Sequence, residues 1–128
     1  MHFATLPCVL ASLRDAVVVV DRDCRVAFMN PAAERLLGRS MSTTQNLHLE
    51  QLLSVVRARD RKPIEELATH DSRALATLVC ADGLVLAPDG SEVPVELHGG
   101  ALSPSGEQNA GAVVVLRDLS AQRRAQAQ

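Results

Sequence analysis

Apolar and polar positions divide the chain into a strand-rich beginning, a helical middle and a strand-rich end. Residues 17–20 are four consecutive valines, whose branched side chains favour a strand, and apolar residues on both faces are typical of a central strand. A polar turn over 21–24 and a second apolar segment over 25–30 complete a predicted hairpin. Residues 111–118 repeat the doubly apolar pattern. We therefore expect the first and last strands to lie side by side in the middle of one sheet.

The sharpest local signal is the pair Asn30-Pro31. Asn is a favoured N-cap and Pro is favoured at the first helical position. Good helix formers follow, and Gly38 supplies a C-terminal stop. The sequence therefore predicts a helix over 31–37.

Other helices are predicted from leucine spacing alone. An amphipathic segment at the N-terminus predicts a flanking helix within 1–14, and leucines at helical spacing predict short helices over 47–56 and from 63 to about 70. Residues 39–46 are polar and predict a loop. The tail over 120–128 is helix-prone and has no stop signal.

The C-terminal half alternates between apolar and polar positions, which predicts strands. The pairs Asp82-Gly83 and Asp89-Gly90 are both compatible with hairpin turns. Over residues 92–98, apolar and polar residues alternate strictly enough to predict a strand with one side exposed to water.

Composition narrows the class of protein. The chain has 128 residues, enough for one domain, with 47% hydrophobic and 22% charged residues. It has two Phe, no Trp and no Tyr, which argues against a surface that stacks nucleic-acid bases. The net charge is −2, and the basic cluster over 57–62 is interpreted as a solvated helix start, so no nucleic-acid partner is expected.

The cysteine count and the hydropathy pattern indicate a cytoplasmic location. Three widely spaced Cys argue against a disulfide framework and for a reducing compartment. No apolar run approaches the roughly 18 residues of a membrane span, so we expect no membrane contact in this segment.

Together, these motifs and their spacing resemble a PAS domain over roughly residues 10–124. The segment LRDAVVVVDRDCRVAFMNPAAERLLG resembles the opening hairpin and helix of that family, LAPDGSEVPVEL its turn and strand, and GAVVVLRDLSAQRR its closing strand. The resemblance implies an α+β fold, a five-stranded antiparallel sheet of order 2-1-5-4-3 with short helices on one face and an N-terminal flanking helix. The expected divisions are a flanking helix (1–14), the PAS core (15–119) and the start of a C-terminal linker helix (120–128).

The resemblance also implies a function. Family members sit upstream of histidine kinase, diguanylate cyclase (GGDEF) or phosphodiesterase domains, form homodimers and relay signals through the C-terminal helix. We expect a sensory module that is not an enzyme, with an output domain in the same chain. Asp118 and Ser120 are the candidate relay residues, with Ser120 as N-cap of the outgoing helix and Asp118 tying the strand end to the core; a purely structural role for both is equally compatible with the sequence.

The residues disfavour several cofactor classes. Haem-binding members use a His on the third helix, where this chain has only His70 at the far end, and light-sensing members bond flavin through a Cys that the segment 47–56 lacks. The four His are scattered and no two Cys lie three residues apart, so no metal site is expected. Cys24 falls in a predicted turn and is expected to be an exposed thiol. Redox sensing through it is one interpretation, but a surface cysteine with no resolving partner nearby is usually incidental.

A ligand pocket between helices and sheet is the remaining candidate site. It would take a small apolar ligand; alternatively, the same residues simply fill the core of a ligand-free dimerisation module. Gly99-Gly100 indicates either a bulge or a close backbone approach. The candidate lining residues are all aliphatic: Leu36, Leu37, Leu52, Leu53, Ile64, Leu67, Leu78, Val95, Leu97 and Val114.

Overall fold

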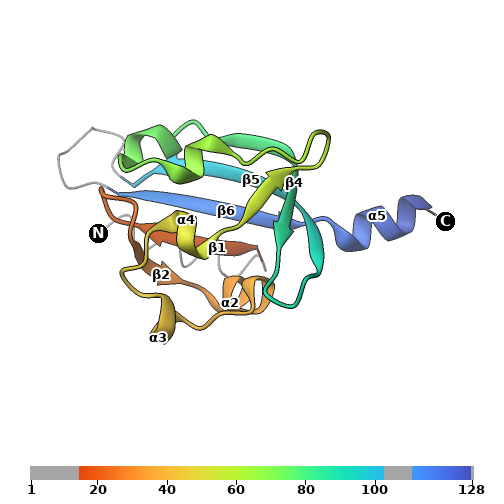
Figure 1. The fold of residues 1–128 in the computed structure, drawn as a ribbon, viewed down its shortest axis with the longest axis horizontal. Coiled ribbons are helices and arrows are strands. Elements are labelled where there is room, and N and C mark those ends of the chain that lie inside the picture. Colours follow the sequence, from red (N-terminus) through yellow and green to blue (C-terminus); the bar gives the residue numbers. More distant parts are fainter. Residues whose placement is uncertain (1–14, 103–110, 128) are drawn as a thin grey trace.

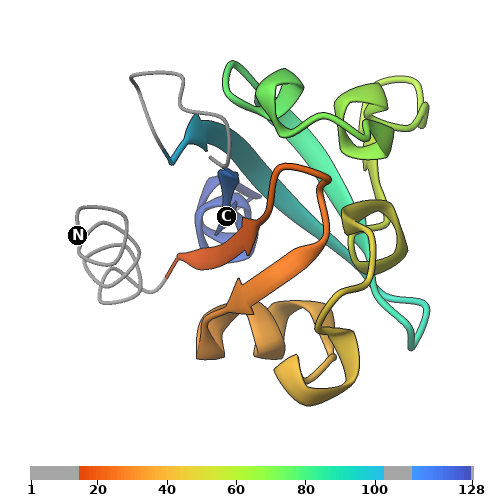
Figure 2. The same cartoon turned by 90° about the vertical axis from the view of Figure 1, so that its left-hand side faces the viewer.

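In the computed structural model, which describes residues 15–102 and 111–127, one antiparallel sheet carries short helices on one side (Figure 1). The predicted N-terminal helix within 1–14 lies outside the described residues. Viewed along the sheet, the short helices gather on the same side, and α5 continues away from the sheet beyond β6 (Figures 1 and 2).

The sheet has six strands in the order β2-β1-β6-β5-β4-β3. The first and last strands are neighbours at its centre, as the valine runs predicted, because β1 pairs with β6 over its whole length. The strand bounds are β1 Ala16–Val20, β2 Val26–Met29, β3 Val55–Arg57, β4 Val79–Leu86, β5 Glu92–Ala101 and β6 Ala112–Asp118.

The prediction of five strands was wrong by one, because β3 was assigned to the helix over 47–56. That helix, α4, covers only Leu49–Leu52, and the chain then turns into an edge strand paired with β4. Val55 and Val56 are β-branched, which favours the extended backbone once a neighbouring strand supplies hydrogen-bond partners.

The other helices are short. The structure has a helix over 41–44 where the sequence predicted a loop. In place of the helix predicted from 63 to about 70 it has a 3-10 turn, η1, and a second 3-10 turn, η2, follows beyond the predicted range. The bounds are α2 Pro31–Leu37, α3 Met41–Thr44, η1 Glu65–Ala68, η2 Ser72–Leu75 and α5 Ser120–Ala127.

The basic cluster after β3 forms a tight turn rather than the predicted helix start. Arg57 N donates to Lys62 O (2.9 Å), and Arg61 adopts a left-handed conformation (φ 57°). The Arg61 guanidinium pairs with Glu92 of β5 at 2.7 Å. The turn is therefore held against β5, with its remaining cations toward solvent.

The core lies between the sheet and the short helices. Inward residues of β1, such as Val18 and Val20, join leucines of the helices in one cluster. Val17, Val19 and Val113 form a second cluster on the opposite face of the sheet. The doubly apolar pattern of β1 therefore corresponds to burial on both faces.

Asn30 ties the first helix to the central strand. Its side-chain oxygen accepts from Val17 N and from Ala33 N, both at 2.9 Å, and its amide donates to Asp15 O at 2.9 Å. The predicted cap thus serves a strand as well as α2. Gly38 ends the helix in the left-handed region (φ 67°), as its residue type favours.

The two Asp-Gly pairs have different roles. Gly90 lies in the turn between β4 and β5 with φ 89°, which is the predicted hairpin. Gly83 lies inside β4, where the pairing with β5 shifts register, so a turn there was a wrong expectation. A Cβ at Gly83 would be 2.7 Å from Leu97, so the absence of a side chain permits the close packing of β4.

Candidate functional site

The predicted pocket residues are brought together, but as packed core. All of them except Leu36 belong to the main buried cluster and expose 5% of their surface or less. Leu36 is half-buried beside that cluster and faces a groove at the end of the sheet.

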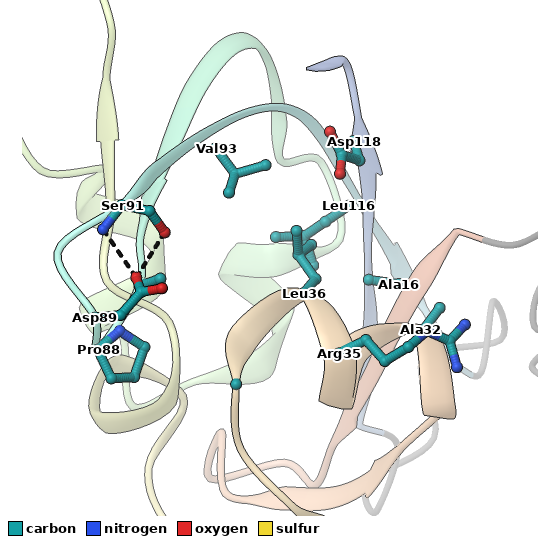
Figure 3. Close-up of a pocket in the computed structure, with 12 residues that line it drawn as sticks. Ala16, Ala32, Arg35, Leu36, Pro88, Asp89, Ser91, Val93, Leu116 and Asp118 are labelled. Carbon is teal, nitrogen blue, oxygen red and sulfur yellow. Dashed lines mark hydrogen bonds between the residues drawn. The ribbon is translucent and has the colours of Figure 1, made fainter. Parts of the chain in front are cut away.

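This groove, with a volume of about 530 Å³, lies between α2 and the β4–β5 hairpin (Figure 3). The central strands β1 and β6 provide its floor through Ala16 and Leu116, and Asp118 stands at the end of β6. We call this site the junction groove, because it adjoins the point where β6 leads into α5. Its other lining residues come from α2 and the hairpin: Ala32, Arg35, Leu36, Gly38, Ala87, Pro88, Asp89, Ser91 and Val93.

One wall of the junction groove carries a carboxylate fixed by its own turn. Asp89 Oδ1 accepts from Ser91 N at 2.9 Å and from Ser91 Oγ at 2.7 Å (Figure 3). These hydrogen bonds stabilise the carboxylate and hold the pKa of Asp89 below its ordinary value. The wall therefore presents a negative charge at neutral pH.

A second carboxylate stands where β6 ends. Asp118 Oδ1 accepts from the backbone N–H of Ser120, the first residue of α5, at 2.8 Å. The side-chain acceptor at the start of α5 is therefore Asp118 and not Ser120, which supplies a backbone donor. Asp118 is partnered with Val95 of β5 in the sheet, and Leu119 N donates to Pro94 O at 2.8 Å.

Sequence reasoning missed the junction groove except for Leu36, Asp118 and the Asp-Gly signal. Small residues such as Ala16 and Ala32 carry no sign of a cavity in sequence, and the groove forms only when α2, β6 and the hairpin meet. The pair Asp89-Gly90 predicted the turn, but it gave no sign that the Asp89 carboxylate lines the junction groove.

Two histidines that look scattered in sequence meet beside α4. The ring centroids of His48 and His70 are 4.6 Å apart. His48 caps α4, with Nδ1 accepting from Glu50 N at 3.0 Å and Nε2 lying 2.7 Å from Thr69 O. Both ring nitrogens of His48 therefore have protein partners, and His70 is exposed. We interpret the pair as part of the packing beside α4 and not as a binding site.

Cys24 is fully buried, contrary to its expected place in an exposed turn. It adopts a left-handed backbone (φ 64°), and burial, assisted by Asp21, Asp71 and Asp23, raises the pKa of its thiol to about 11. Such a thiol is almost entirely protonated at neutral pH and is a poor nucleophile.

Neither a metal-binding cluster nor a membrane-spanning helix occurs among the described residues. Residues 15–102 and 111–127 hold no group of three or more His, Cys, Asp or Glu side chains placed to bind a metal ion. Within the same ranges, no helix has the length and apolar character needed to cross a bilayer.

Solved structures similar to this chain include PAS domains. The PAS domain of nitrogen regulation protein NR(II) from Vibrio parahaemolyticus is 21% identical, with a TM-score of 0.62 over 88% of this chain and 97% of that one. A PAS domain from Colwellia psychrerythraea is 17% identical, with a TM-score of 0.63 over 92% and 97%. A domain of a sensory box sensor histidine kinase/response regulator from Geobacter sulfurreducens is 16% identical, with a TM-score of 0.56 over 89% and 90%.

These likenesses concern the fold. The comparison with curated proteins found no match to the sequence. The sequence profile described as PAS fold matches residues 10–124, nearly the whole chain. With the order of strands and the central pairing of β1 with β6, this match shows that the chain belongs to the PAS family.

Proposed function

We propose that this PAS domain is a cytoplasmic sensory module that binds a small molecule in the junction groove and relays its presence through α5. The proposed output is a histidine kinase or a cyclic-di-GMP enzyme in the same longer chain, and the module itself performs no catalysis. Solved structures of similar fold include a domain of a sensory box sensor histidine kinase/response regulator and the PAS domain of a nitrogen regulation protein, which supports a place in signal transduction.

The observation that carries the proposal is the position of Asp118. It lines the junction groove and also accepts the hydrogen bond from Ser120 that begins α5. A molecule that engages the other oxygen of this carboxylate would act on the same group that accepts from the first backbone donor of the helix. Because helix ends depend on such acceptors, occupancy of the groove would be coupled to the start of α5.

A second path supports the same coupling. Val93 of β5 lines the junction groove, and the next residue, Pro94, accepts from Leu119 N immediately before α5. A shift of the hairpin wall therefore reaches α5 through the backbone as well. If α5 has two arrangements, a ligand would shift the equilibrium between them by an amount set by the difference in its affinity for the two.

Hydrogen exchange of the α5 amides tests the coupling. Ala32→Phe would fill the groove from α2, and Asp118→Ala would remove the acceptor for Ser120; both should change exchange within residues 120–127. Asp118→Asn keeps a side-chain oxygen and should preserve the wild-type rates more closely. Ala27→Phe, at an exposed position of β2, is the matched control. Identical α5 exchange in all variants would refute the proposed relay.

A mass measurement tests occupancy. We expect freshly purified protein to lose a small mass when it is denatured, because the groove is within the usual size range of ligand sites. With no Trp and no Tyr, the near-ultraviolet background is low, so an absorbance band would identify a chromophore such as haem or flavin directly. Equal native and denatured masses with a blank spectrum would favour the ligand-free alternative.

The ligand-free alternative is a homodimerisation module that sets the geometry of the output domains. It is favoured by the packing of the predicted pocket residues, which fill the core. Homodimerisation is also part of our main proposal. Sedimentation that gives a monomer at high concentration, unchanged when the first 14 residues are deleted, would contradict it.

A further inference from the structure

We infer that the ligand of the junction groove is a small aliphatic amine, with its protonated amino group at Asp89 or Asp118, which lie on opposite sides of the groove (Figure 3), and its carbon chain against the floor. The inference rests on the proposed function, since it concerns the same groove. It is carried by the separation of apolar and charged groups within that groove.

The interior of the groove is aliphatic. Leu36, Val93 and Leu116 converge from α2, β5 and β6, with Ala16 beside them on the floor (Figure 3). An alkyl chain placed there removes apolar surface from water on both the ligand and the protein. There is no aromatic side chain in the lining, so nothing in it stacks on a planar ring.

The polar groups of the lining favour a cation. Asp89 and Asp118 each use Oδ1 for a backbone or hydroxyl donor of the same chain. In the part of the chain that the structure describes, neither Oδ2 has a hydrogen-bond or ion-pair partner. An ammonium group has three donors and no acceptor, so it can donate to the free oxygen of either aspartate. A carboxylate on the ligand would instead be repelled by these side chains, because the charges are alike.

Arg35 is the one cation in the lining, and it does not neutralise these carboxylates. No ion pair joins it to Asp89 or Asp118 among the described residues, and its side chain extends on the side opposite Asp89 (Figure 3). Arg117, next to Asp118 in β6, lies 3.6 Å from Asp15 instead. The lining therefore carries a formal excess of one negative charge.

The test compares three probes of equal chain length: hexylamine, 1-hexanol and hexanoate, each titrated into the 128-residue chain and followed by amide chemical shifts. Hexylamine should bind about tenfold more tightly than either of the others, with shifts in α2, the β4–β5 hairpin and residues 118–120. Asp89→Asn and Asp118→Asn should each weaken hexylamine about threefold, as expected for exposed charge pairs.

Asp21→Asn is the matched control. Asp21 is an exposed carboxylate that also accepts backbone hydrogen bonds, from Asp23 N and Arg25 N, but it follows β1 at the end away from Ala16. Its replacement should leave hexylamine binding unchanged. Nα-acetyl-lysine methylamide carries the same ammonium group on a peptide backbone. If it binds more weakly than hexylamine, the ligand is a free amine. If it binds more tightly, the free amine is overturned in favour of a lysine of a partner protein.

Tightest binding of hexanoate, lost in Arg35→Gln, would overturn the amine and leave the groove as the sensory site. Equal binding of the three probes, or of none, would also overturn the amine. The relay stands on a separate result, because α5 exchange in Ala32→Phe and Asp118→Ala is measured without any ligand.

Discussion

Gly99 is required by the backbone of a neighbouring element rather than by its own conformation. A Cβ at this position would collide with the carbonyl oxygen of Leu75 at the end of η2. Gly99 N also donates to Leu78 O at 2.8 Å, so the strand and the segment after η2 are in direct backbone contact. Of the two interpretations of Gly99-Gly100, the close approach therefore applies to Gly99.

We expect Gly99→Ala to lower the free energy of unfolding by about 1–3 kcal/mol, because the methyl group has no room without a shift of backbone. Urea unfolding followed by far-ultraviolet circular dichroism measures this. Gly100→Ala is the control, since its Cβ would meet Val113 at 3.5 Å, an ordinary contact. Equal losses in both variants would contradict the assignment of the close contact to Gly99.

Cys24 shows how burial changes reactivity at a single residue. With the thiol pKa raised from 9.0 to about 11, the thiolate fraction near neutral pH falls about a hundredfold. In a variant that keeps only Cys24, iodoacetamide should therefore react far more slowly in the native state than in urea. Ala27→Cys in a background without the natural cysteines supplies an exposed control.

The same shift has a consequence for stability. The folded state holds the proton of Cys24 more tightly than the unfolded state does, so stability is retained below about pH 9 and decreases as pH rises towards about 11. Replacing Cys24 by Ala should flatten this part of the profile. A profile that is unchanged in this variant would contradict the assignment to Cys24.

At the scale of elements, the Asn30 side chain joins α2 to β1 through three hydrogen bonds. Asn30→Ala would leave the N–H groups of Val17 and Ala33 without their acceptor in a buried place. We expect a loss of about 2–4 kcal/mol, because each buried unsatisfied donor costs about 1–3 kcal/mol.

Ser40→Ala is the matched control for Asn30→Ala in urea unfolding. Ser40 occupies the N-cap of α3, but its side chain makes no capping hydrogen bond, so a loss below about 0.5 kcal/mol is expected. A loss at Asn30 as small as that at Ser40 would show that the connection between helix and strand is not important for stability.

At the scale of the whole molecule, the core and the junction groove should respond differently to the same substitution. Leu67 is 3% exposed within the main cluster, whereas Leu36 lines the groove. Leu67→Ala should lower the free energy of unfolding by about 2–5 kcal/mol. Leu36→Ala should lower it by about 1 kcal/mol, because less apolar surface is buried there.

Ligand affinity should distinguish the two variants in the opposite order from stability. Hexylamine affinity should fall in Leu36→Ala and stay unchanged in Leu67→Ala, provided that the latter remains folded by circular dichroism. If the two variants lost stability equally, the distinction between core and groove would be wrong.

Local chemistry was sufficient for the elements that depend on near neighbours. Asn30-Pro31 and Gly38 specify the ends of α2, and the valine runs specify central strands, because capping and burial on both faces follow from residue type and period. The resemblance to the PAS family was confirmed over residues 10–124. It could be seen in the sequence because it rests on these same local signals and on their order along the chain.

The tertiary structure decided everything that depends on distant partners. β3 is a strand only because β4 lies beside it, Cys24 is buried only because other segments cover its turn, and His48 meets His70 across two elements. The junction groove likewise exists only where α2, β6 and the β4–β5 hairpin converge. The sequence by itself determined the caps, the central strands and the family, since these depend on short-range chemistry; the edge strand and the groove depend on space between segments, which residue order does not encode locally.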